Sequence, residues 1–291
     1  MVVTGVIVAT ILALGNWWWN NEASGYSRIV YKPLQMSATL EPPGRLMLRM
    51  NDPGWLGRRL DDLIPDHTHL MHLYVIRLPE MERVWHLHPD QMEAGVFAQD
   101  LPDMPAGRYQ LFGDIVHRSG IAETLVTEVD LPEVAGKPLS GDDSQGAGPA
   151  LSQSSPARTV AELSGGRRMV WESAPGGLRA RQVSTFRFRV EDRERRPVED
   201  LQLYMGMPGH AAFVKTDRTV FAHVHPSGSV PMAALSLTGS GDPHAGHKMG
   251  TGMPSEVSFP YGFPQPGSYR IYVQIKMDDR VETGVFDAHV N

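Results

Sequence analysis

The chain has 291 residues, no cysteine, a formal net charge of −6 and 21% charged residues. This acidic balance argues against a nucleic-acid partner, because such binding relies on clustered lysine and arginine that neutralise phosphates. Without cysteine there are no disulfides, thiolate zinc sites or cysteine nucleophiles, so a metal ion would be held by histidine, methionine, aspartate or glutamate. At about 100–200 residues per domain, the length predicts two domains.

Residues 1–19 carry no charge and end in three consecutive tryptophans, Trp17 to Trp19. At about 1.5 Å per residue, such a helix is roughly as long as the hydrocarbon layer of a membrane is thick, and tryptophan is common at the membrane interface. No basic residue precedes Val2, unlike the start of a cleaved signal peptide. We therefore expect 1–19 to be a transmembrane anchor, free-standing or the last helix of a larger membrane protein, with a buried helix of a soluble fold as the alternative.

The rest of the chain predicts short strands separated by proline and glycine, without a long helical period. Residues 132–159 are rich in glycine, serine, proline and alanine, which predicts a flexible linker. The segments on either side, 28–131 and 160–291, are each about the size of an Ig domain. The predicted fold is all-β, with two tandem Ig-like antiparallel β-sandwich domains after an N-terminal transmembrane helix.

The two segments also align with each other, which indicates a tandem repeat. Residues 61–72 match 199–210 without a gap, and 84–89 match 221–226 after the loss of one residue in the turn. The equivalent tyrosines Tyr109 and Tyr269 each follow a glycine at the start of a long strand, and we expect a structural role like that of a tyrosine corner.

Each repeat predicts a hairpin that carries three histidines. In the second repeat, a two-residue turn places His210 opposite His225, and His223 shares their face. A three-residue loop gives the first repeat the same arrangement. Opposed Cβ atoms lie about 4.5–5.5 Å apart, close enough for imidazoles to converge on one ion. The predicted triads are His72, His86 and His88, and His210, His223 and His225.

Histidine in one repeat is methionine in the other at three aligned positions. The pairs are His67 with Met205, His69 with Met207, and His117 with Met277. Proton transfer cannot use methionine, whereas imidazole and thioether both ligate copper, thioether chiefly Cu(I). We therefore expect copper rather than zinc, with a first domain that prefers Cu(II) and a second that prefers Cu(I). Core packing is the alternative for Met205 and Met207.

A glycine-rich insertion over 236–255 carries a further cluster of histidine and methionine. Its candidate ligands are His244, His247, Met249 and Met253. The composition predicts a mobile loop that captures or delivers a soft metal, or a disordered loop in which these residues are incidental.

The sequence resembles bacterial extracytoplasmic copper-handling modules of the CopC and YtkA-like kind. Its motif from Tyr204 to His210, followed by 221–226 and 259–263, is similar to a pattern that recurs in membrane-anchored bacterial proteins. Those modules are small Ig-like sandwiches with histidine and methionine ligands. The resemblance covers roughly the last ninety residues well and the first repeat loosely. It departs from CopC in one respect, because an N-terminal histidine ligand is excluded behind an anchor.

Together these observations predict a membrane-anchored copper-binding protein on the periplasmic or extracellular side, which buffers copper or exchanges it with a donor or acceptor protein or a membrane complex. Arg28 and Lys32, just after the tryptophans, argue weakly against export of the two repeats. The alternative is a non-metal interaction module or accessory subunit of a larger membrane complex, with structural histidines. No nucleophile elbow, phosphate loop or metalloprotease helix is present. We therefore expect no enzyme, and a metal-dependent oxidoreductase or hydrolase is the weakest alternative.

Overall fold

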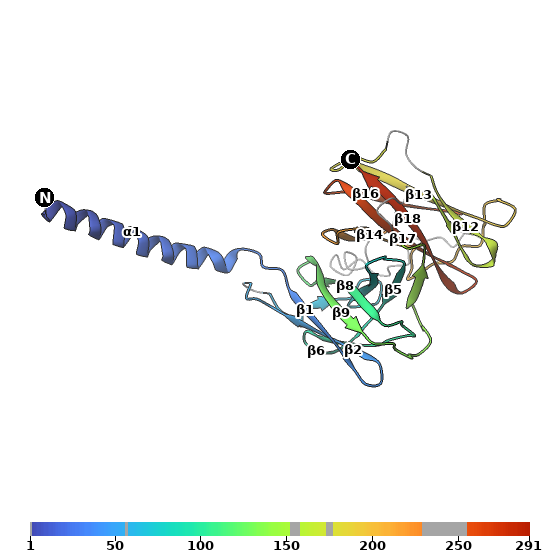
Figure 1. Ribbon diagram of the computed structural model, residues 1–291, viewed down its shortest axis with the longest axis horizontal. Coiled ribbons are helices and arrows are strands. Elements are labelled where there is room, and N and C mark those ends of the chain that lie inside the picture. The colour runs from blue at the N-terminus through green and yellow to red at the C-terminus, as the bar shows by residue number, and fades with distance from the viewer. Residues whose placement is uncertain (1, 56–57, 152–157, 173–176, 229–254) are drawn as a thin grey trace.

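The computed structural model describes residues 2–55, 58–151, 158–172, 177–228 and 255–291. The described chain is mostly β, in several antiparallel sheets, with one apolar helix at the N-terminus (Figure 1). The sheets form two halves that lie against each other, and the helix projects away from both.

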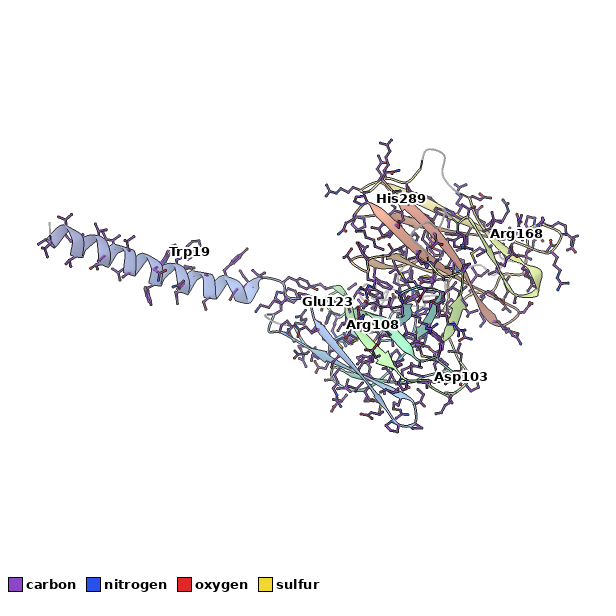
Figure 2. The ribbon with its side chains drawn as sticks, viewed as in Figure 1. Trp19, Asp103, Arg108, Glu123, Arg168 and His289 are labelled. Atoms are coloured by element: carbon purple, nitrogen blue, oxygen red, sulfur yellow. The ribbon has the colours of Figure 1, made fainter. Side chains whose placement is uncertain are left out.

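Helix α1 (Val2–Ile29) is longer than the predicted segment 1–19. Its stretch Val2–Ser27 is long and apolar enough to cross a membrane, judged by length and composition. None of that stretch is buried against the rest of the chain, and Figure 2 shows Trp19 on the projecting part of the helix. The helix therefore adds nothing to the protein core.

The first half contains two antiparallel sheets. One has the order β1-β2-β7-β6 and consists of β1 (Gln35–Glu41), β2 (Arg45–Asn51), β7 (Val96–Asp100) and β6 (Asp90–Glu93). The other has the order β10-β5-β4-β8-β3, with β9 also paired to β8, and consists of β10 (Ser144–Ala147), β5 (Arg83–Leu87), β4 (His72–Leu78), β8 (Gly107–His117), β3 (Leu63–Ile64) and β9 (Ala122–Leu131). Side chains such as Leu48 and Phe97 from one sheet and Leu73 and Leu111 from the other form a shared hydrophobic core.

The second half repeats this layout. One sheet consists of β11 (Val160–Glu162), β12 (Arg168–Glu172), β13 (Val183–Glu191) and β16 (Glu256–Gly262), with a short 3-10 helix, η1 (Ser164–Gly166), between the first two strands. The other has the order β15-β14-β17-β18, from β15 (Phe221–Val224), β14 (His210–Lys215), β17 (Gly267–Met277) and β18 (Arg280–Val290). Phe186, Phe188, Phe213 and Phe286 lie in the core that the two sheets share.

Equivalent strands occur in the same order, β5-β4-β8-β9 in the first half and β15-β14-β17-β18 in the second. Both predicted hairpin registers are confirmed, since Tyr74 pairs with His86 and Ala212 pairs with His223. The hydroxyl of Tyr109 donates to the carbonyl of Pro105, four residues earlier, and the hydroxyl of Tyr269 donates to a carbonyl at the same spacing. These tyrosines therefore have the structural role expected from the sequence.

The prediction of a flexible linker is wrong for residues 144–147, which form β10 and pair with edge strand β5. A Cβ on Gly146 would lie 2.5 Å from Cβ of Thr283, and one on Gly148 would lie 2.7 Å from Cβ of Val285. Glycine thus allows this segment to approach β18 closely, which composition alone cannot distinguish from flexibility.

The two halves meet through the sheets that contain β4 and β14. A third apolar cluster joins Tyr74, Ile76 and Phe112 of the first half to Val214 and Tyr272 of the second. The hairpin histidines lie at this interface, so the fold brings the two predicted triads together.

Candidate metal centre

Eight histidines gather where the hairpins of the two halves meet. His67, His69, His72, His86 and His88 come from the first half, and His210, His223 and His225 come from the second. Within this group each ring lies close to several others; for example, the ring centroids of His72 and His223, from opposite halves, are 5.0 Å apart. We call these eight residues the histidine cluster.

The first triad comprises His72, His86 and His88, with one ligand nitrogen from each within 4.8 Å of the other two. In each imidazole, one nitrogen faces the other two rings (the inner nitrogen), and the other (the outer nitrogen) is held by a hydrogen-bond acceptor. The Nε2–H of His72 donates to the carbonyl of Asp66 (3.0 Å), the Nδ1–H of His86 to Oε1 of Gln274 (2.9 Å), and the Nδ1–H of His88 to Oδ1 of Asp143 (3.0 Å). The inner nitrogens are then unprotonated.

These inner nitrogens face one another. Nδ1 of His72 lies 3.1 Å from Nε2 of His86, and Nε2 of His88 is buried with no hydrogen-bond partner in the described chain. Two nitrogens bound tetrahedrally to one ion at about 2.0–2.1 Å are roughly 3.3 Å apart. The first triad therefore has both the spacing and the outer hydrogen bonds that metal-binding histidines show.

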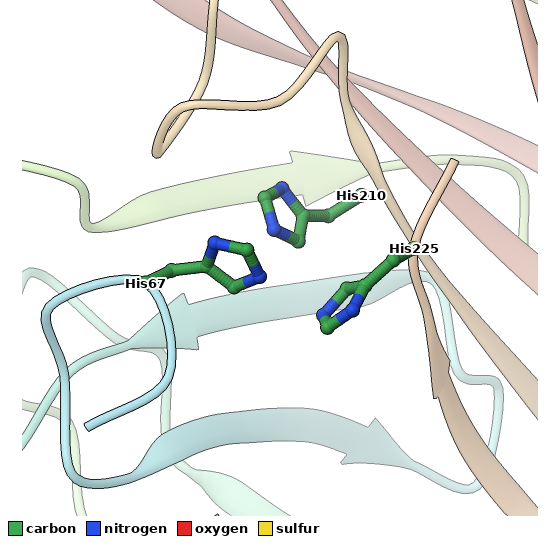
Figure 3. A group of neighbouring side chains, drawn as sticks. All are labelled: His67, His210 and His225. Atoms are coloured by element: carbon green, nitrogen blue, oxygen red, sulfur yellow. The ribbon is translucent and has the colours of Figure 1, made fainter. Parts of the chain in front are cut away.

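The second triad comprises His67, His210 and His225, again with ligand nitrogens within 4.8 Å. Figure 3 shows His67 on a loop of the first half, facing His210 and His225 of the second. The Nδ1–H of His67 donates to the carbonyl of Met205 (3.1 Å), which leaves its buried Nε2 without a partner among described residues. The same holds for Nε2 of His225 and for both nitrogens of His210, whose side chain is fully buried.

The second triad differs from the one that the sequence predicts, because His67 of the other half takes the place expected for His223. The rings of His210, His223 and His225 do lie together, with centroids 4.8–5.5 Å apart. Face-to-face packing of the halves, however, brings the loop of His67 onto them. Alignment of the repeats cannot reveal a contact between repeats.

Two carboxylates stand beside the second triad. The Asp66 oxygens lie 3.7 Å from Nε2 of His67 and 3.6 Å from Nε2 of His225. An oxygen of Asp114 lies 3.4 Å from Nδ1 of His223, whose Nε2 is buried and has no partner in the ranges described. Asp66 is thus placed to ligate an ion, and Asp114 is placed to orient His223.

Burial keeps the cluster in the form that binds metals. Loss of solvation, together with the neighbouring imidazoles, lowers the pKa of His72 to about 3 and that of His225 to about 4. Burial also lowers the pKa values of His67, His86, His88, His210 and His223. These seven imidazoles are therefore neutral at pH 7, with lone pairs available for an ion.

A cleft of about 600 Å³ reaches the cluster from the surface, lined among others by His69, His88, Asp142 and Asp143. The ring of His69 stacks on that of His88 with centroids 4.0 Å apart, and its Nε2 lies 3.1 Å from Oδ2 of Asp142. His69 therefore belongs to the entrance of the site and to neither triad.

Other candidate ligands lie outside both triads. His117 contacts Asp62 through Nδ1 (2.7 Å) and Glu123 through Nε2 (2.8 Å), whereas its counterpart Met277 lies in the hydrophobic core of the second half. Met207 is buried, and Met205 contacts the cluster through its carbonyl. His244, His247, Met249 and Met253 lie outside the described residues.

The sequence analysis gives no role in the site to four polar residues around the triads: Asp66, Asp114, Asp143 and Gln274. A signal existed for two of them, because Asp114 pairs with His72 and Gln274 pairs with His210 at equivalent strand positions. Each contacts a histidine of the opposite half, His223 and His86 respectively. Asp143 lies in the glycine-rich segment that was interpreted as a linker.

Comparison with protein families matches residues 163–291 to a family described as a domain of unknown function, DUF8832. This similarity spans the second half, including His210, His223 and His225, but none of the first-half histidines. No curated protein matches the chain.

Proposed function

We propose that this protein binds transition-metal ions, copper foremost, in two histidine triads between two Ig-like β-sandwich domains, and that α1 anchors it in a membrane. The two sheets that share one core in each half and the paired tyrosine hydrogen bonds support the Ig-like interpretation. The anchoring rests on the length and composition of α1.

The unpaired imidazole nitrogens carry the proposal. Six buried nitrogens on five histidines of the cluster have no hydrogen-bond partner in the described chain. A buried polar group without a partner costs about 1–3 kcal/mol, so an apolar or fully paired core would be more stable than this one. Ions bound in the two triads would give partners to four of these six nitrogens, one each on His67, His88, His210 and His225, and would keep every outer hydrogen bond.

Three imidazoles suit both copper and zinc. Copper is favoured by the methionines among the candidate ligands of the sequence. Met205 stands where the other repeat has His67, and its carbonyl accepts from that histidine. The segment 236–255 adds further histidine and methionine to the chain. Methionine is a ligand for Cu(I) but seldom for zinc.

We further propose that the domains lie on the periplasmic or extracellular side, and that the protein buffers copper or exchanges it with a donor or acceptor. The resemblance to copper-handling modules supports the location. The cleft at His69 and Asp142 supports exchange, because it leads from the surface to His88.

Metal analysis tests the proposal. The full chain in detergent would be loaded with Cu(II), Cu(I) or Zn(II), washed free of loose metal and analysed for bound ions. We expect stoichiometric copper, and about one ion fewer in His72→Ala or in His210→Ala. His289→Ala is the matched control, because His289 is exposed on the outer part of the second half (Figure 2) and should leave binding unchanged.

A chain without stoichiometric metal would contradict the proposal. The histidines would then be structural, and the protein would be better described as an interaction module. Equal losses in His72→Ala and His289→Ala would show that the bound metal lies elsewhere.

A further inference from the structure

The two triads are almost as close to each other as the rings within either one. Ring centroids of His72 and His86 are 5.3 Å apart in the first triad, and those of His210 and His225 are 5.5 Å apart in the second. Between the triads, His67 lies 6.0 Å from His72 and His86 lies 6.3 Å from His210. Ions in the two triads would therefore be near neighbours, as in two-metal sites, where the separation is about 3.5–4 Å.

One imidazole belongs to neither triad and lies between them. The ring of His223 is 5.0 Å from that of His72 in the first triad and 4.8 Å from that of His225 in the second. Asp114 is the neighbour of its Nδ1, and its buried Nε2 has no hydrogen-bond partner in the described chain. His223 is thus a seventh ligand within reach of both ions.

Charge favours an anion between two such ions. Imidazole binds a metal ion in its neutral form, so two Cu(II) ions would bring four positive charges into a buried site. Of the carboxylates, Asp66 lies nearest to unpaired ligand nitrogens, at 3.6 and 3.7 Å. Asp114 and Asp143 face the outer nitrogens of His223 and His88. A small anion bound to both ions would lower their mutual repulsion.

We propose that the two triads form one dinuclear copper centre, in which Asp66 and His223 are additional ligands and a small oxygen ligand bridges the ions. For two Cu(II) ions, the bridge is hydroxide, formed when a bound water releases one proton to solvent. The cleft that reaches His88 provides the path for water and small anions. This proposal rests on the proposed function, because it requires copper in both triads.

Spin counting tests the proposal. The full chain in detergent would be loaded with Cu(II) at pH 7.5, its copper measured by elemental analysis, and its unpaired spins counted by electron paramagnetic resonance. A bridging oxygen couples two Cu(II) ions, so we expect two copper ions per chain but far fewer than two detectable spins. In His67→Ala, which loses the second triad, we expect one copper ion and one spin; His289→Ala should behave like the wild type.

The outcomes separate this proposal from the function on which it rests. Two copper ions with two full spins would overturn the dinuclear centre and leave metal binding intact, as would a single copper ion with one spin. No bound copper would overturn both. The spin count of the wild-type protein tests the dinuclear centre even if a variant fails to fold.

Discussion

Two polar regions are buried in the same interface, and they differ in how completely their groups are paired. The guanidinium of Arg270, fully buried, donates to both oxygens of Asp287 and to carbonyls of Glu80, Met81 and Pro149. In the histidine cluster, by contrast, six buried nitrogens lack a partner in the described chain.

This difference separates a structural from a ligand-binding use of buried polarity. Arg270 joins strand β17 of one half to the β4–β5 turn of the other, and its pairing leaves nothing for a ligand to satisfy. The histidines of the first triad, and His67 of the second, have hydrogen-bonded outer nitrogens, as metal-binding histidines do, whereas both nitrogens of His210 lack a partner among the described residues. The effect on stability of a change in the histidine cluster can therefore be compared with that of a change at Arg270.

The largest expected effect is that of pH on the metal-free protein. Seven histidines of the cluster have folded-state pKa values below the usual 6.5. Between about pH 4 and 6.5 the unfolded chain therefore binds more protons than the folded one, and stability falls as pH falls, by up to about 1.4 kcal/mol per histidine per pH unit. Chelator-treated protein should lose several kcal/mol of unfolding free energy between pH 7 and pH 5, measured with urea.

Asp114 works in the opposite direction, because burial raises its pKa to about 6 and protonation then favours the folded state. One carboxyl offsets only part of the effect of seven imidazoles. Stability that is unchanged or higher at pH 5 would contradict the burial of neutral histidines.

Replacement of Arg270 tests the other region. Arg270→Met leaves buried Asp287 without its bidentate partner, and loss of one member of a buried ion pair costs about 3–5 kcal/mol. The loss should be similar at pH 7 and pH 6. Arg108→Met is the control, since Arg108 is exposed and its pair with Glu128 contributes about 1 kcal/mol or less. Equal losses in the two variants would refute the structural role of Arg270.

Metal should stabilise the histidine region by mass action. At a free copper concentration one hundred times the dissociation constant, one occupied site adds about 2.7 kcal/mol to the unfolding free energy, provided that the unfolded chain does not bind copper. Thermal unfolding with and without copper should show this gain in the wild type and a smaller one in His210→Ala. Stabilisation of the same size in both proteins would place the ion outside the second triad.

The smallest effect concerns an outer hydrogen bond. Asp143 accepts from Nδ1–H of His88, and loss of such a partner typically weakens metal binding about 10–100-fold. In Asp143→Asn, competition with a chelator should show this loss for the first triad, with the second little affected. Asp142→Asn is the matched control, because the side chain of Asp142 contacts His69 rather than a triad histidine.

Local rules predicted what lies within one hairpin. Loop length and the two-residue period of strands placed His72 across from His88 and His210 across from His225, as the pairing of the neighbouring residues shows. The positions of the structural tyrosines likewise followed from their place after a glycine at the start of a strand.

Contacts between the halves could not be predicted in this way. His67 joins His210 and His225 only because the two sheets pack face to face, and β10 forms only because edge strand β5 accepts it. The exchange of His117 for Met277 also has a local explanation, since one side chain lies between two carboxylates and the other in an apolar core. A histidine that aligns with a methionine of the other repeat therefore indicates a metal ligand only where both side chains face the same site.

Anomalous diffraction at the copper edge, from crystals of the copper-loaded chain, tests the central claim most directly. We expect one peak within bonding distance, about 2 Å, of the inner nitrogens of His72, His86 and His88, and a second among His67, His210 and His225. A map without density at either position, or with copper only elsewhere on the chain, would contradict a metal centre between the two halves.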